Sequence, residues 1–555
     1  MRRRAAVALL LICATAGATA ARPPEPRLFR VPPKAPDGTN PWVFEVHPEY
    51  RTRMIRIDPL EVNGTTATRV FWGEQRLRLD VTFARAGIGA IFVQADILDG
   101  VLFGDNGEFG KVPHVNSGLG IASKYPNNSG WEVGLLAGGD PLDTSGYGPV
   151  LRGIEPLRIN FAYGEVMLPV GVLRVGRQPT SDSNWVAGND GRTGRNRWGA
   201  SSYHQAVDRV AFGTKLSEIV RYARDGKDYV PNTRLDDGVI FGAAFDFLVL
   251  DDITVRNDDL RGVAFQLSWM SPGGPRLGNF TDLELTAILT HRWDRRFNTA
   301  LFGIPMRLRF TNGPFSFRGD VMLIRGSTRE LSAGLAKLTN DPVTDQKLDS
   351  TGAEVLLEYR LKDFTFVAQW GYASGDSDPR SGTAQTSFTW PRDNNLGLVL
   401  FEHTLNFQSA RSAAVGIENL RQLEAESFPL TELATEGRVT DVNALFPQVF
   451  WDPHESLRLK AGVLFAWAAS PVTDPIQTLL AYDGKEISDD ALNYNGGKPG
   501  KYWGTELDLG VEYRYREFFE AVLEGGVLFP GSGLEDENGD AVPSWLVELR
   551  MTFAL

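Results

Sequence analysis

The feature that most constrains this chain is a two-residue alternation of apolar and charged side chains near its C-terminus. In residues 505–516, leucine, valine and tyrosine occupy every second position, and Glu506, Asp508, Glu512 and Arg514 lie between them. On a helix, residues two apart point in different directions, whereas on a strand they share one face. The segment is therefore predicted to be a strand with one apolar face and one charged face.

The same alternation recurs along most of the chain, at 77–83, 283–289, 302–310, 315–323, 353–362 and 457–467. A soluble β-sandwich rarely reaches this many strands without domain boundaries. Aromatic residues, which membrane interfaces favour, lie at strand ends: Tyr513, Tyr515, Phe518, Phe519 and Trp545. We therefore expect the apolar faces to contact lipid and the charged faces to line a lumen. Gly462 and Gly510 are predicted to face this lumen, so their substitution by arginine should be tolerated.

The connections between these segments indicate how the strands are arranged. Short ones at 168–170, 312–314, 362–364 and around Glu517 contrast with long polar ones at 179–205, 327–349, 374–437, 470–502 and 531–544. Periplasmic turns and long extracellular loops are typical of transmembrane barrels. The predicted fold is all-β, an antiparallel up-and-down transmembrane barrel of about 18 strands, within roughly 16 to 20. This strand count places 397–411 in a loop and not in the barrel wall. The long segment 374–437 could fold inward and narrow the pore.

The N-terminal region predicts export. Arg2, Arg3 and Arg4 precede an apolar run, and residues 18–20, Ala-Thr-Ala, provide the small side chains of a cleavage site. We expect a signal peptide at 1–20, a proline-rich periplasmic tail at 21–50, and an outer-membrane barrel at 51–555. The last strand, WLVELRMTFAL, resembles the C-terminal signature of bacterial outer-membrane proteins, although Leu555 stands where an aromatic residue is usual.

Composition excludes several classes of protein and of partner. The single cysteine, Cys13, lies in the predicted leader, which leaves no cysteine for disulfides or metal sites in the mature chain. A net charge of -12 argues against a nucleic-acid partner. The expected partners are outer-membrane lipid and lipopolysaccharide, the barrel-assembly machinery, and a small hydrophilic solute or saccharide.

The sequence has few features of an enzyme. It lacks the G-x-S-x-G, H-E-x-x-H and P-loop motifs, and its six histidines are scattered. We expect those histidines to be solvated or at strand ends, and we expect neither catalysis nor a cofactor. The acidic stretch EDENGD at 535–540 could hold Ca²⁺, but a charged hairpin tip is the preferred interpretation.

A resemblance to known proteins rests on three short motifs. They are "GRQ" at 176–178, "DR" at 208–209 and YASGDSD at 372–378. In this arrangement they resemble the alginate-export and related porin-like families of Gram-negative outer membranes. The resemblance implies a porin-like barrel. For alginate exporters it also implies a strongly cationic lumen. In this chain, however, the positions predicted to face inward carry acidic and basic residues in near balance. This balance favours a mixed-charge pore.

The charged residues predicted to line the pore are Arg177, Arg209, Arg307, Arg309, Glu358, Arg360, Arg458, Lys460, Glu512 and Arg514. Arg177 and Arg209 are either a basic ladder that guides solutes or structural ion pairs beside Asp208. The predicted function is a passive outer-membrane channel for hydrophilic solutes or saccharides. The alternatives are a non-transporting barrel that serves as an adhesin, an anchor or a membrane-embedded hydrolase, and a porin for exopolysaccharide export.

Overall fold

The structure is a computed structural model of the chain. It describes residues 30–32, 38–62, 69–104, 154–181, 185–192, 196–201, 204–229, 237–247, 260–271, 280–339, 342–378, 382–409, 420, 423–425, 427, 435, 437–474, 478 and 491–555. The predicted leader at 1–20 lies outside the described residues.

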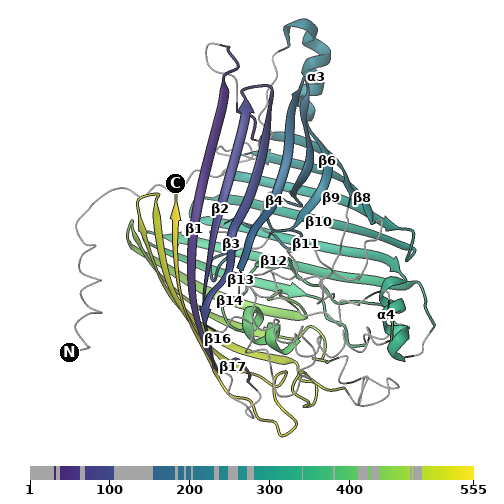
Figure 1. The fold of residues 1–555 in the computed structure, drawn as a ribbon, viewed down its shortest axis with the longest axis vertical. Helices are drawn as coiled ribbons and strands as arrows, with labels where there is room; N and C mark the ends of the chain where they lie inside the picture. Colours follow the sequence, from purple (N-terminus) through teal and green to yellow (C-terminus); the bar gives the residue numbers. More distant parts are fainter. Residues whose placement is uncertain are drawn as a thin grey trace.

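Eighteen strands form one antiparallel sheet that closes on itself (Figure 1). They are β1 (Trp42–Asp58), β2 (Val70–Arg85), β3 (Gly89–Gly104), β4 (Ile154–Leu168), β5 (Gly171–Pro179), β6 (Ala206–Lys215), β7 (Gly238–Phe247), β8 (Arg261–Ser271), β9 (Thr281–Asp294), β10 (Thr299–Asn312), β11 (Phe315–Thr328), β12 (Gln346–Leu361), β13 (Phe364–Ala373), β14 (Val442–His454), β15 (Leu457–Trp467), β16 (Tyr502–Tyr515), β17 (Phe519–Pro530) and β18 (Ser544–Ala554). Each strand pairs with the next, and β1 also pairs with β18. The predicted up-and-down barrel is confirmed, and the described part of 397–411, residues 397–409, lies outside its wall.

Helical structure is sparse in the described residues. It comprises α3 (Leu216–Asp225), the 3₁₀ turn η2 (Gly226–Asp228), α4 (Glu330–Thr339) and the π-helix η3 (Leu400–Leu405). Within the described part of the chain, no helix is both long and apolar enough to cross a membrane.

The barrel wall begins earlier than predicted. β1 starts at Trp42, inside the stretch expected to be a proline-rich tail, and pairs with β2 from its first residue. The pairing of β18 ends at Glu49, so the start of β1 is an edge strand. Pro48 lies in this edge portion, where a residue without an N–H is tolerated in a sheet.

The two ends of the barrel differ in their connections. At the end that we call the turn end, strands are joined by 86–88, 169–170, 313–314, 362–363, 455–456 and 516–518. The opposite end, which we call the loop end, carries most of the long connections, including 374–441 and 468–501. Two connections depart from the predicted alternation. The segment 216–237, which contains α3, lies at the turn end, and the short 295–298 lies at the loop end.

The two faces of the wall divide as the alternation predicts. In β16, the side chains of Leu507 and Leu509 are 42% and 66% exposed on the outer face, whereas Glu506 and Asp508 between them are buried on the inner face. The same division holds in β8, where Phe265 and Leu267 are about half exposed and Ser268 is buried. The outer surface is therefore a belt of apolar side chains.

Candidate functional site

Two stretches of chain from the loop end fold into the barrel. We call residues 185–192 and 196–201 the first inner segment, and residues 382–409 the second inner segment. Trp198, Trp390 and Phe401 are at most 2% exposed. They belong to one apolar cluster with inward side chains of β1, β2 and β14–β18. Part of the lumen is therefore filled by a hydrophobic core. The sequence allowed inward folding for 374–437, whereas 179–205 was predicted to be an extracellular loop.

A wall carboxylate fixes the start of η3 in the second inner segment. Glu506 accepts hydrogen bonds from the backbone N–H groups of Leu398, Val399 and Leu400, at 2.5, 2.9 and 2.7 Å. The first N–H groups of a helix have no partner within the helix, and they favour a negative charge. The contact explains why a buried glutamate is stable on this part of the inner face.

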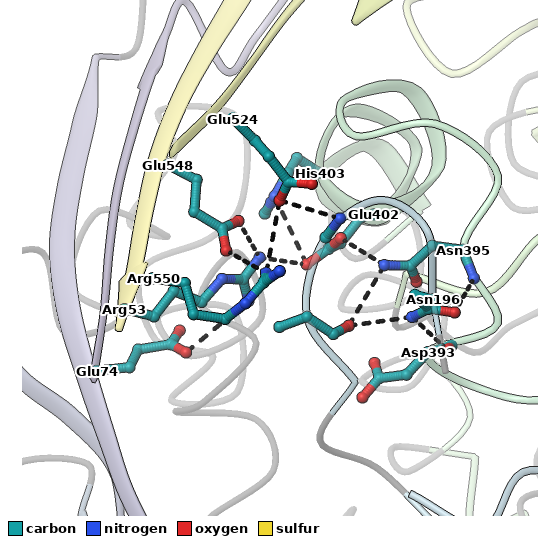
Figure 2. A network of polar contacts seen from close by, with 12 residues as sticks. Arg53, Glu74, Asn196, Asp393, Asn395, Glu402, His403, Glu524, Glu548 and Arg550 are labelled. Carbon is teal, nitrogen blue, oxygen red and sulfur yellow. Dashed lines mark hydrogen bonds and ion pairs between the residues drawn. The ribbon is translucent and has the colours of Figure 1, made fainter. Parts of the chain in front are cut away.

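A second contact joins the inner segment to the seam between β1 and β18 (Figure 2). The guanidinium of Arg53 lies 2.6 Å from a carboxylate oxygen of Glu402, 2.9 Å from Glu548 and 3.9 Å from Glu74. Glu548 also pairs with Arg550 at 2.9 Å. Arg53 therefore connects β1, β2, β18 and the second inner segment.

Burial perturbs two titratable groups of the second inner segment. It raises the pKa of Glu402 to about 7, because Arg53 is shared among several carboxylates and offsets only part of the desolvation. Burial and the nearby Arg53 charge lower the pKa of His403 to about 3. His403 packs against Trp72, with ring centroids 6.0 Å apart. The expectation of a solvated histidine is wrong here, because its segment folds inward.

The first inner segment crosses the lumen. Its Trp185 ring lies under the guanidinium of Arg307 in β10, at 4.6 Å. Trp198 donates a hydrogen bond to Gln448 in β14 at 3.1 Å, and the ammonium of Lys460 in β15 lies 4.9 Å from its ring. On the other side, Arg78 of β2 donates to the carbonyl of Gly191. The segment is thus attached to opposite parts of the wall.

The two inner segments also bind each other. The Asn196 side chain donates to the carbonyl of Asp393 at 2.7 Å, and the Asn395 side chain donates to the carbonyl of Trp198 at 3.2 Å. Asn395 also donates to Glu402 at 3.2 Å. The two segments therefore form one body, attached to the wall at several points.

The inner face differs between two parts of the barrel. We call β14–β18, β1 and β2 the crowded wall, because their inward side chains pack against the inner segments. We call β7–β9 the bare wall, because its inward side chains include the small or neutral residues Gly242, Ala244, Ala264, Gln266 and Thr290, all partly exposed. Among the described residues, the apolar cluster of the inner segments packs mainly against the crowded wall, and the inner face of the bare wall stays partly exposed.

Most of the predicted pore residues lie on the inner face, and each has an ion-pair partner. The pairs are Arg209 with Asp246, Arg307 with Asp320, Arg309 with Glu284, Arg197 and Arg360 with Glu358, Arg458 with Asp452, Lys460 with Glu524, and Arg514 with Glu512 and Glu520. Arg309 and Arg360 have side chains 55% and 63% exposed, and both lie near the turn end. This end of the lumen therefore presents charges to solvent.

Arg177 is an exception. It lies opposite Ala162 and Asp208, on the same face as the exposed Val175 and Val210, and pairs with Asp208 at 3.1 Å. The prediction that it lines the pore is wrong, because strand alternation turns it outward while the neighbouring Arg209 turns inward. The structural interpretation of Arg177, an ion pair with Asp208, is the one the structure supports.

Sequence reasoning missed Arg53, Glu402 and His403. It also left open the role of the acidic hairpin, where the Asp536 carboxylate accepts hydrogen bonds from the N–H groups of Asn538 and Asp540, at 2.8 and 2.9 Å. No cluster of three potential metal ligands occurs among the described residues. Asp536 thus stabilises a turn at the hairpin tip.

Comparisons with known proteins give similarity at the level of solved structures. No protein-family profile and no curated protein sequence matches the chain. The outer membrane protein OprD from Pseudomonas aeruginosa is 10% identical, with a TM-score of 0.44, over 92% of this chain and 93% of that chain. Pseudomonas aeruginosa OpdK with vanillate is 10% identical, with a TM-score of 0.44, over 92% of this chain and 98% of that chain. Neither similarity assigns a family to this chain.

Proposed function

We propose that this protein is an outer-membrane channel through which small hydrophilic solutes or saccharides pass passively. The observation that carries the proposal is the combination of a closed barrel, an exposed apolar outer surface and a charged inner face that, among the described residues, stays partly exposed along β7–β9. An apolar belt on a closed barrel suits a bilayer, where an open sheet edge would leave backbone groups unpaired. In this proposal the turn end is periplasmic and the loop end extracellular.

The path for solutes runs between the bare wall and the inner segments. Small residues such as Gly242 and Ala264 leave space there, and the partly exposed Thr290 and Gln266 add hydroxyl and amide groups to this face. At the turn end, the exposed Arg309 and Arg360 lie beside Glu284 and Glu358. Paired charges of both signs favour hydrophilic solutes without a strong preference for one sign.

The remaining features of the proposal follow from this location. The chain is exported through a cleaved signal peptide at 1–20, is folded by the barrel-assembly machinery, and contacts lipid and lipopolysaccharide with its outer face. The barrel acts as a channel and not as an enzyme. A non-transporting anchor is the competing class, and an open water path distinguishes the two.

Conductance through planar bilayers tests the proposal. The purified barrel is expected to give discrete current steps, and Ala264→Trp on the bare wall is expected to make those steps smaller. Leu267→Trp is the matched control, since Leu267 lies on the same strand but is 54% exposed on the outer face, and its steps are expected to be unchanged.

Two outcomes would count against the channel. A folded barrel that conducts neither intact nor after deletion of 385–409 would favour the anchor class. Equal currents from Ala264→Trp and the unmodified chain would place the path elsewhere than along the bare wall.

A further inference from the structure

Helix α3 lies at the turn end, between β6 and β7 (Figure 1). One side of it is fixed by polar contacts around Glu218, whose side chain is 3% exposed. Glu218 accepts hydrogen bonds from Arg221 at 2.8 Å and from the Tyr229 hydroxyl at 2.8 Å. Desolvation, followed by the hydrogen bond to Glu218, raises the pKa of Tyr229 to about 12. The polar side of the helix is therefore bound to its own connection.

The opposite side of α3 is an apolar stripe that nothing in the described chain covers. It consists of Leu216, Ile219, Val220 and Ala223, at the i, i+3, i+4 and i+7 spacing of one helix face. The first three are 38%, 44% and 66% exposed. Glu218 lies about 160° around the helix from Val220, as expected for residues two apart. The helix therefore turns its polar side inward and its apolar side outward, the reverse of a helix that packs on a soluble core.

The stripe continues the apolar belt of the barrel. In β6, Val210 is 39% exposed on the outer face, Phe212 follows two residues later on the same face, and Leu216 begins the helix. In β7, Val239 is 41% exposed at the same end of the barrel. A surface that meets acyl chains along β6 therefore leads directly to the stripe.

Basic side chains border the stripe. Arg224 has a side chain 71% exposed and pairs with Asp225, the next residue, at 2.6 Å. Lys227 in η2 is also exposed. Long cationic side chains beside an apolar helix face are typical of helices at a bilayer surface, because they reach the phosphates while the apolar face enters the acyl region.

We propose that α3 is an interfacial helix that lies on the periplasmic leaflet and binds its phospholipids. The stripe enters the boundary between headgroups and acyl chains, and Arg224 and Lys227 bind headgroup phosphates. The proposal depends on the barrel crossing a membrane with its turn end periplasmic, and not on what passes through the lumen. A phospholipid is favoured over a protein partner because the stripe is narrow and is continuous with the lipid-facing belt.

Spin labels on introduced cysteines test the proposal in proteoliposomes that contain no other protein. Cys13, the only cysteine of the chain, is replaced by alanine. The label is then placed at Val220→Cys or Ile219→Cys in the stripe, or at Ser217→Cys, an exposed control on the flank of the same helix. The stripe labels are expected to collide more with oxygen, which concentrates in acyl chains, than with a water-soluble nickel chelate, and the Ser217 label is expected to show the reverse.

The outcomes separate the possible occupants of the stripe. High nickel accessibility at all three positions would overturn the proposal and leave the stripe for a periplasmic protein. Nickel accessibility that is low at all three would also overturn it, because the flank would then be covered as well. Either reading can be made whether or not the same preparation conducts ions, so failure of the channel and failure of the interfacial helix are distinguishable.

Discussion

The crowded wall and the bare wall belong to the same sheet, yet their inner faces have different environments. On the crowded wall, Arg53 and Glu548 are at most 6% exposed and are bonded to each other beneath the inner segments. On the bare wall, partly exposed Gly242, Ala264 and Thr290 face inward. The difference shows that a charged inner face does not by itself mark a passage. Buried charges here hold chain segments in place, whereas the inward side chains that stay partly exposed are small or neutral on the bare wall.

The largest expected effect comes from removing the cation at the seam. Arg53→Met leaves Glu402 and Glu548 buried without their shared partner, and breaking a buried ion pair in this way costs about 3–5 kcal/mol of unfolding free energy. Arg309→Met is the control near the bare wall, where the exposed pair with Glu284 contributes about 0–1 kcal/mol. Urea unfolding in lipid measures both losses. Equal losses would remove the distinction between the walls.

A charge on the outer face is expected to cost slightly less. Leu509→Arg places a cation in the bilayer, at a cost of about 2–4 kcal/mol near its midplane. Ala264→Arg on the bare wall is expected to assemble normally. The strand alternation predicted the same tolerance at Gly462 and Gly510, but a side chain there would meet Phe446 or Lys460 at 2.6 Å. Assembly yields in membranes compare the variants, and normal assembly of Leu509→Arg would contradict the outer-face assignment.

A single methyl group probes the packing of each inner face. A Cβ at Gly526 would lie 2.7 Å from Asp508 and 2.8 Å from Val399, so Gly526→Ala is expected to cost about 1–3 kcal/mol. At Gly242 the nearest atom is 3.4 Å away, an ordinary contact, and Gly242→Ala is expected to change stability by less than about 0.5 kcal/mol. Thermal unfolding of the pair sharpens the contrast, which fails if Gly526→Ala is neutral.

The remaining expected effect is a pH dependence confined to the second inner segment. Because the pKa of Glu402 is raised from 4.5 to about 7, the folded state holds a proton that the unfolded state has lost. The free energy of unfolding should therefore fall as pH rises from about 4.5 to 7 and then level off. The total loss is at most about 1.4 kcal/mol for each unit of pKa shift. Glu402→Gln should lack this component in unfolding curves at several pH values. An unchanged pH profile would show that Glu402 titrates normally. His403, with its pKa near 3, stays neutral across this range.

The wall was predictable because each strand carries its own two-residue code. That code explains the eighteen strands, the outward Leu509 and the inward Arg514. The same code gives the correct orientation of Arg177. Arg177 lies two residues after Val175 in β5, so alternation places both side chains on the outer face. The short GRQ motif is therefore a poorer guide to the orientation of Arg177 than the strand alternation around it.

The filled interior was less predictable, although one signal was present. In β14, Val442, Ala444 and Phe446 face inward and Leu445 faces outward, so the strand is apolar on both faces near the loop end. Such a strand indicates a core on its inner side. Nothing local, however, identifies Glu402 as the partner of Arg53, since 349 residues separate them in the chain. Contacts of that range depend on the closed barrel and not on any sequence period.

The position of Arg53 has a consequence for the order of assembly. Its carboxylate partners come from β2, from β18 and from the second inner segment, so its set of contacts is complete only when the first and last strands of the chain have met. Joining residues so far apart carries a large loop-closure entropy, and such contacts form late. The inner segments are therefore expected to fold last, by packing against a barrel that has already closed.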